Sequence, residues 1–339
     1  MSENTKSEIA AAQKARARFG RLFTKEKYAA MAGCKTVIEV ASILRENPFY
    51  AAGLSNVSDT QLNRHMLEDI LKDRLYTDFA ELFGFDYALG SNLYRLAVID
   101  CEIDIIMDYA RLLNSGTVAK FRPSLPEFLE RHLDLELSIL RESDDFNGLL
   151  RAVKRREFLH IVSLCRPKDN QPIDLSRLEY LLQDHFCKKV LEIADGNQKI
   201  IEIFGTEADF QNLQMILRNK KYFEADANKI KAHLLHLHYY FTPKKLDRLC
   251  ESSIDEIFTF LSSTPYHEYF TQENFTVAIT GSRIIRDICR KAMRFETEPA
   301  AILSAYMLLA KNQYDCLTTI IEGIRYSLPS DKIMELLPI

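Results

Sequence analysis

The sequence contains few of the residues that interrupt regular secondary structure. Its 339 residues include 11 Gly and 10 Pro, which is 21 of 339, or about 6%, where about 12% is usual. Sandwiches and doubly wound sheets place many glycines and prolines in their turns, so this scarcity favours an all-helical chain. Tryptophan is absent and aromatic residues make up 10% of the chain, so no stacking platform for nucleic-acid bases stands out.

The chain also lacks an excess of one charge and a long apolar run. Lys plus Arg is 44 and Asp plus Glu is 48, giving a net charge of −4, which excludes non-specific nucleic-acid binding through a general basic excess. Residues 299–310 are as long as any stretch free of charge, whereas a membrane span needs about 20 apolar residues. The polar N-terminus does not resemble a signal peptide. We therefore expect a soluble cytoplasmic protein with no nucleic-acid partner and no direct membrane span.

Motifs for catalysis, cofactors and metals are missing as well. The sequence contains no GxGxxG, no GxxxxGK[ST], no GxSxG and no HExxH. The number of cysteines is odd and none forms a CxxC pair, so we expect reduced cysteines, most of them in the core. They are Cys34, Cys101, Cys165, Cys187, Cys250, Cys289 and Cys316. The sequence therefore offers no motif from which to assign catalytic, cofactor-binding or metal-ligating residues, and we assign none.

A cluster of histidines offers one alternative to this interpretation. The apolar pattern of residues 225–240 predicts a helix, on which His233 and His236 would share a face and could bind a metal. His238 would lie about 200° around the helix from His236, and no acidic residue follows at a suitable spacing. We therefore favour half-buried histidines on an amphipathic helix. A metal-dependent helical enzyme using His233 and His236 remains an alternative, and a generic helical scaffold is another.

Two groups of basic residues are interpreted as ordinary helix faces. The first could bind an acidic partner, but a solvated face near a helix C-terminus is the better interpretation. It comprises Arg151, Lys154, Arg155 and Arg156. The second could contact nucleic acid or a membrane, but Ala-rich helix formers precede it, which favours an amphipathic helix. It comprises Lys14, Arg16, Arg18, Arg21, Lys25 and Lys27.

Helical periodicity is strong, and a helix-start pattern occurs three times. Apolar stripes predict helices at 62–83, 175–193 and 300–324, the first capped by Ser58 with Gln61. Thr36, Asp145 and Ser253 each precede a similar apolar stripe at i, i+3, i+6 and i+7 and are expected to cap it. The steps are 145 − 36 = 109 and 253 − 145 = 108, so the chain contains a repeat of about a hundred residues.

A second marker follows each copy by 60 to 66 residues, where polar residues are expected to start an apolar helix. It begins at Glu102, at Glu207 with Asp209 and Asn212, and at Gln313. The two markers predict three homologous helical units at 1–118, 119–224 and 225–339. Three such units can enclose a central cavity when arranged around an axis.

The end and the beginning of the chain resemble one known family. Gly323, Leu328, Pro329, Ile333 and Leu337 match the ending of the C-type subunits of V-type and A-type rotary ATPases, known in eukaryotes as d-type subunits. The opening also resembles that family, through the segments 15–18 and 22–28 and the Asn-Pro-Phe-Tyr of residues 47–50. In the middle unit, Asp209 and Asn212 match its polar pair. The chain departs from the pattern at Gln313, Cys316 and Thr318, where the family tends to have Glu, Asn and Arg.

The resemblance implies an all-α, funnel-like protein with pseudo-threefold symmetry and a central cavity. Members of the family are non-catalytic central-stalk connectors, peripheral on the cytoplasmic side of the membrane. They join the D-type and F-type subunits of the rotor shaft to the membrane ring of proteolipid subunits. The resemblance does not assign the partner interface to individual residues, and it implies no cofactor.

Overall fold

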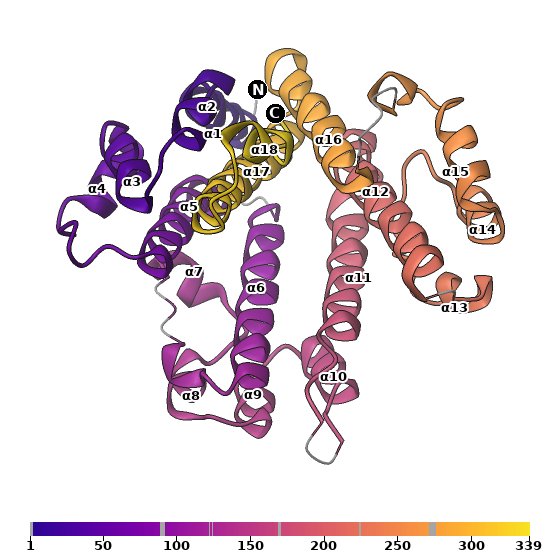
Figure 1. Cartoon of the computed structure of the whole chain (residues 1–339), viewed down its shortest axis with the longest axis horizontal. Helices are drawn as coiled ribbons and strands as arrows, with labels where there is room; N and C mark the ends of the chain where they lie inside the picture. The colour runs from indigo at the N-terminus through magenta and orange to yellow at the C-terminus, as the bar shows by residue number, and fades with distance from the viewer. Residues whose placement is uncertain are drawn as a thin grey trace. The chain divides into compact units, whose positions relative to one another are not determined.

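The computed structural model describes residues 3–88, 92–121, 123, 125–168, 171–223, 225–270 and 276–339. In these residues it contains 18 α-helices and two 3-10 helices, and no β-strand apart from one isolated bridge between Leu135 and Val153 (Figure 1). The prediction of an all-α fold is confirmed. The chain divides into two compact units, residues 1–90 with 251–339, and residues 91–250.

The first unit, called unit 1, is organised around one long apolar helix. This helix, α17 (Pro299–Arg325), packs against α1, α2, α5 and α16. Every residue from 301 to 310 is buried, as expected for a helix segment that is apolar on all sides. The other helices are α1 (Glu3–Phe19), α2 (Lys25–Ala32), α3 (Val37–Arg45), α4 (Pro48–Leu54), α5 (Arg64–Ala88), α15 (Ile254–Leu261), η2 (His267–Phe270), α16 (Val277–Phe295) and α18 (Ser330–Glu335).

The second unit, called unit 2, also has long helices at its centre. Its helix α11 (Leu175–Ala194) packs against α6 (Tyr94–Ser115), α10 (Arg156–Leu164) and α12 (Gln198–Phe223). Residues 96–103 of α6 are all buried. The shorter elements are η1 (Val118–Lys120), α7 (Glu127–His132), α8 (Leu137–Glu142), α9 (Phe146–Ala152), α13 (Ala227–Lys231) and α14 (Pro243–Glu251).

The three long helices predicted from apolar stripes are present, but one predicted cap is wrong. They correspond to α5, α11 and α17. Asn63 caps the N-terminus of α5, because its side-chain oxygen accepts the backbone N–H of Met66 at 3.0 Å. The side chains of Ser58 and Gln61 instead bond to each other at 3.0 Å in the preceding turn. The helix predicted at 225–240 is also wrong, because α13 ends at Lys231.

The repeated helix caps are confirmed at all three positions. The side chains of Thr36, Asp145 and Ser253 each accept the backbone N–H three residues later, at 3.2, 2.7 and 3.3 Å. At Ser253 the capping box is complete, because Glu256 accepts the backbone N–H of the cap residue at 2.7 Å. Glu39 accepts the N–H of the residue before its cap, also at 2.7 Å. The three unit boundaries stay a prediction.

Candidate functional site

Buried polar side chains lie at the middle of three long helices. The prediction that these residues start helices is wrong, because Glu102 lies within α6, Asp209 and Asn212 within α12, and Gln313 within α17. Glu102, Asp209 and Asn212 are fully buried, and Gln313 is 7% exposed. A buried polar group is costly unless it is hydrogen-bonded, so the partners of these side chains determine what they do.

In unit 2, two side chains of α12 hold the irregular segment 232–242. Asn212 accepts the backbone N–H of Leu235 at 2.7 Å and donates to its carbonyl at 3.2 Å. The carboxylate of Asp209 accepts the N–H groups of residues 239–241, the shortest of them from Tyr240 at 2.6 Å. The segment also passes close to α12 at Gly205, where an added Cβ would lie 3.0 Å from Tyr239. Because the side chains of α12 satisfy these N–H groups, the segment is not helical.

The environment of Asp209 makes its ionised form costly. Burial raises the pKa of this carboxyl to about 6, and the three backbone N–H groups that it accepts only partly oppose the shift. Asp209 therefore keeps its proton to a higher pH in the folded chain than an exposed aspartate does. Its titration changes the charge directly beneath residues 239–241.

A second buried carboxylate holds the segment before α8. Glu102 accepts the backbone N–H of Asp134 at 2.5 Å and pairs with Arg155 at 3.0 Å. Arg155 also bonds to the Asp134 carboxylate at 2.8 Å. Burial raises the pKa of Glu102, although Arg155 opposes the shift. Arg155 is therefore an internal counter-ion, and the expectation that it belongs to a solvated basic face is wrong.

The third helix, α17, holds the segment between α1 and α2 in the same way. Gln313 accepts the backbone N–H of Phe23 at 2.7 Å and donates to the Tyr50 hydroxyl at 2.9 Å. The rings of Phe23 and Tyr50 stack with their centroids 5.7 Å apart. In each of the three cases, a polar side chain of a long helix holds the irregular segment that comes before two short helices. The second of these short helices begins at one of the three repeated caps. The family departures at Gln313 and Cys316 thus fall on buried residues that pack inside unit 1.

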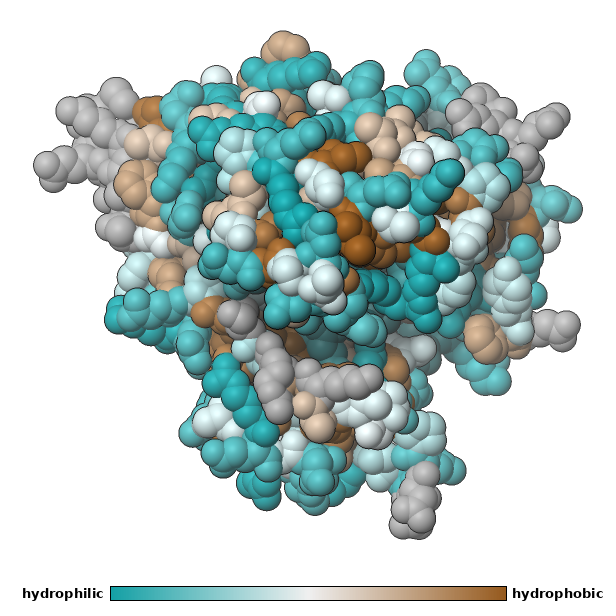
Figure 2. All heavy atoms as spheres, turned by 60° about the vertical axis from the view of Figure 1, so that its left-hand side comes forward, coloured by the Kyte–Doolittle hydropathy of each residue, from teal (hydrophilic) through white to brown (hydrophobic). Residues whose placement is uncertain are grey.

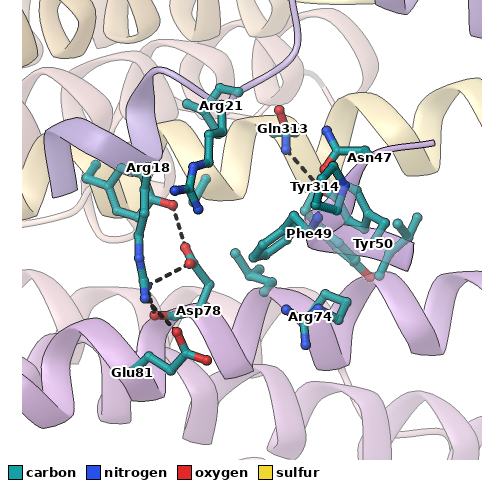
Figure 3. Close-up of a pocket in the computed structure, with 16 residues that line it drawn as sticks. Arg18, Arg21, Asn47, Phe49, Tyr50, Arg74, Asp78, Glu81, Gln313 and Tyr314 are labelled. Atoms are coloured by element: carbon teal, nitrogen blue, oxygen red, sulfur yellow. Dashed lines mark hydrogen bonds and ion pairs between the residues drawn. The ribbon is translucent and has the colours of Figure 1, made fainter. Parts of the chain in front are cut away.

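Beside Gln313, unit 1 contains a cavity of about 690 Å³ (Figure 3). At one side of the cavity lies Arg18, which pairs with Asp78 at 2.7 Å and with Glu81 at 2.6 Å. The Tyr306 hydroxyl donates to Asp78 at 2.5 Å. Burial raises the pKa of Asp78, and the charge of Arg18 opposes the shift. The other residues that line the cavity are Arg21, Leu22, Asn47, Pro48, Phe49, Tyr50, Leu71, Arg74, Leu75, Ala310, Gln313 and Tyr314.

The N-terminal basic residues are largely used within unit 1. The helix α1 that carries several of them buries Ala11, Ala12 and Ala15, as an amphipathic helix should. Arg16 donates to the carbonyl of Met293 at 3.0 Å, and it also bonds to the carbonyl of Glu296. These internal contacts agree with the prediction of an ordinary amphipathic helix.

The histidines do not form the arrangement that a metal site would need. His233 follows the end of α13, and its Nδ1 lies 2.9 Å from the carbonyl of Lys229. The Nδ1 of His236 donates to the Asp184 carboxylate at 2.6 Å. Within the residues that the structure describes, no group of three or more His, Cys, Asp or Glu side chains could hold a metal ion. The prediction that His233 and His236 share a helix face is wrong.

Taken together, the fold and these contacts define an all-α protein in which buried polar groups of the described residues join its own segments. Among the described helices, none is long and apolar enough to cross a membrane. On the face shown in Figure 2, hydrophilic side chains predominate and hydrophobic ones form small groups.

Residues 13–336 match the sequence model of the ATP synthase (C/AC39) subunit, and the chain belongs to this family. This match confirms the resemblance to the family of C-type and d-type subunits, so the chain is a subunit of a V/A-type rotary ATPase. No curated protein sequence matches the chain.

Sequence reasoning did not find the cavity. The cavity forms only when the chain folds, since Arg21, Arg74 and Gln313 line it together and are far apart in sequence. The sequence marks Gln313 as a polar repeat position and Arg21 as part of a basic stretch, but no local motif marks Arg74 or places the three residues together.

Proposed function

We propose that this chain is the non-catalytic central-stalk connector of a rotary V/A-type ATPase. The observation that carries the proposal is the family match over residues 13–336. In this role the chain joins the D-type and F-type shaft subunits to the cytoplasmic face of the proteolipid ring. It thereby couples ATP hydrolysis or synthesis to ion transport.

The internal contacts support a part that transmits torque. A connector must resist twisting, and a stiff element needs its segments fixed to one another. Long helices with closely packed apolar faces give this stiffness, and the hydrogen bonds of Glu102, Asp209, Asn212 and Gln313 fix the intervening irregular segments to them. Scarce glycine in the sequence has the same effect.

The repeated contact also supports three homologous units, at 1–118, 119–224 and 225–339, around a central cavity. The marker of the first unit, Glu102, holds the segment leading to the second cap at Asp145. The marker of the third unit, Gln313, holds the segment leading to the first cap at Thr36. In this pattern the polar marker of one unit holds the segment before the cap of the next unit, and the marker of the last unit holds the segment before the cap of the first. Such a pattern is expected when the units close into a ring, and not when they form a linear stack.

The proposal is tested by binding to purified partners. The chain is mixed with D-type and F-type shaft subunits and separately with a detergent-solubilised proteolipid ring, at salt low enough to preserve polar contacts. We expect the chain to be recovered with both, and to hydrolyse no ATP by itself. Recovery with neither partner would leave a generic helical scaffold as the better description.

A further inference from the structure

Two arginines of the cavity in unit 1, Arg21 and Arg74, form no close ion pair with a described side chain, although the charge of Arg74 helps to lower the pKa of Asp78 from a distance. Three arginines line the cavity, namely Arg18, Arg21 and Arg74, together with two carboxylates. Arg18 binds both carboxylates, those of Asp78 and Glu81. Within the described part of the chain, the side chains of Arg21 and Arg74 make no hydrogen bond and no ion pair, and the Nε of Arg74 is buried without a hydrogen-bond partner.

Arg74 is held in place although its donors are unused. Its side-chain carbons pack where Gly53 leaves room, since a Cβ added at Gly53 would lie 3.3 Å from the Cδ of Arg74. Its guanidinium lies over the ring of Phe49, with its carbon 4.7 Å from the ring centroid. A guanidinium fixed by packing loses little freedom when it binds an anion, which favours binding.

The two arginines lie on opposite sides of the cavity. Figure 3 shows Arg21 reaching toward it from the segment after α1, and Arg74 from α5 on the other side. Arg21 is exposed, whereas Arg74 is half-buried, so the cavity is open to solvent near Arg21. Apolar and aromatic side chains line the space near them, among them Phe49, Leu71 and Leu75.

We propose that this cavity binds a small organic oxyanion, a phosphate or carboxylate joined to an aromatic or apolar body. The oxyanion accepts hydrogen bonds from Arg21 and Arg74, whose planar donor groups suit both phosphate and carboxylate. The apolar body lies against Phe49 and the leucines. A volume of about 690 Å³ falls in the range of small-molecule sites. This assignment goes beyond the connector role and does not depend on it.

The neighbouring contacts couple the cavity to a hydrogen bond inside the fold. Tyr50 and Gln313 line the same cavity and belong to the contact that holds Phe23 to α17. A ligand that joins Arg21 to Arg74 spans the segment next to Phe23 and α5. Its binding therefore slows opening of the hydrogen bond from the Phe23 N–H, which hydrogen exchange measures.

Isothermal titration of the full chain with phenyl phosphate and with benzoate tests the proposal. At least one of the two is expected to bind with a Kd below about 1 mM, and the affinity falls as salt is raised. Benzyl alcohol and inorganic phosphate serve as probes for each half of the ligand, and both are expected to bind at least about tenfold more weakly. Hydrogen exchange with and without the bound probe should show slower exchange around residue 23.

Variants locate the binding. Arg21→Gln and Arg74→Gln are each expected to weaken binding about tenfold or more. Arg294→Gln is the matched control, because Arg294 is an exposed arginine of the same unit that does not line the cavity. Arg21 is exposed, so its variant should fold even where Arg74→Gln does not.

Three results would overturn the proposal. The first is the absence of binding by both organic probes. The second is binding that Arg21→Gln leaves at the wild-type affinity. The third is an equal affinity for inorganic phosphate, which would mark an adventitious ion only, because the apolar wall would then contribute nothing.

Discussion

Replacing Asn212 by alanine should destabilise unit 2 far more than the same change at Asn219. Both asparagines lie on α12. Asn212 is fully buried and makes both of its hydrogen bonds to the backbone of Leu235, which is itself only 6% exposed. Asn219 is only half-buried, and its side chain donates to the carbonyl of Met215 one turn earlier in the same helix.

The magnitude follows from the groups left unpaired. In Asn212→Ala the N–H and the carbonyl of Leu235 both lose their partner in a buried position, at about 1–3 kcal/mol each. We therefore expect a loss of about 3 kcal/mol in the free energy of unfolding. In Asn219→Ala a single redundant hydrogen bond is lost and helix propensity improves, so the change stays within about 0.5 kcal/mol.

Urea unfolding followed by circular dichroism measures both variants, and hydrogen exchange reports on residues 235–241 separately. The Asn212 variant should expose these amides to faster exchange, whereas the Asn219 variant should not. Equal stability of the two variants would refute the reasoning that side chains of α12 hold the segment 232–242.

Three further predictions concern the other buried groups. Because burial raises the pKa of Asp209 to about 6, the folded chain binds that proton more tightly than the unfolded chain, and stability is lost as pH rises. Between about pH 5 and pH 7.5, ionisation of Asp209 should lower the free energy of unfolding by about 1 kcal/mol. Urea midpoints measured across this range should fall less in Asp209→Asn than in the wild type. The same pH dependence in both proteins would contradict the raised pKa. Glu102→Gln removes the buried carboxylate that pairs with the half-buried Arg155 and leaves that guanidinium only Asp134, so it should cost about 2 kcal/mol. Lys154→Gln on the exposed pair nearby should cost less than about 1 kcal/mol, and urea unfolding measures both changes. Gly323→Ala places a Cβ 2.6 Å from a buried side chain of α18, so it should lower the free energy of unfolding by about 1–3 kcal/mol and speed hydrogen exchange in α18. Gly33→Ala is the control, because a Cβ there makes only ordinary contacts and should change little. Equal effects of the two variants would argue against close packing of α18 on α17.

The parts of the fold that local rules govern could be predicted from sequence. Apolar stripes located α5, α11 and α17, and the caps at Thr36, Asp145 and Ser253 depend only on residues within four positions. The segment 232–242 was mispredicted for the opposite reason. Its apolar spacing suits a helix. Its backbone N–H groups instead donate to the carboxylate of Asp209 and the amide oxygen of Asn212, which lie on another helix, α12.

The polar marker of each repeat was found but misinterpreted. A charged residue before an apolar stripe ordinarily lies at a helix N-terminus, so Glu102 was expected to begin a helix. Folding instead places it mid-helix, where its partner Arg155 comes from another part of the chain. The cavity shows the same limit, because Arg21 and Arg74 become neighbours of one space only when α1, α5 and α17 pack together.

In its proposed role, this chain connects the shaft to the proteolipid ring. The most direct measurement is to isolate an affinity-tagged copy from its native membranes in mild detergent and to quantify every recovered subunit by mass spectrometry. The connector role predicts one copy of the chain for each D-type shaft subunit, recovered together with the proteolipid ring. Recovery of the tagged chain without shaft subunits and without the ring would contradict it.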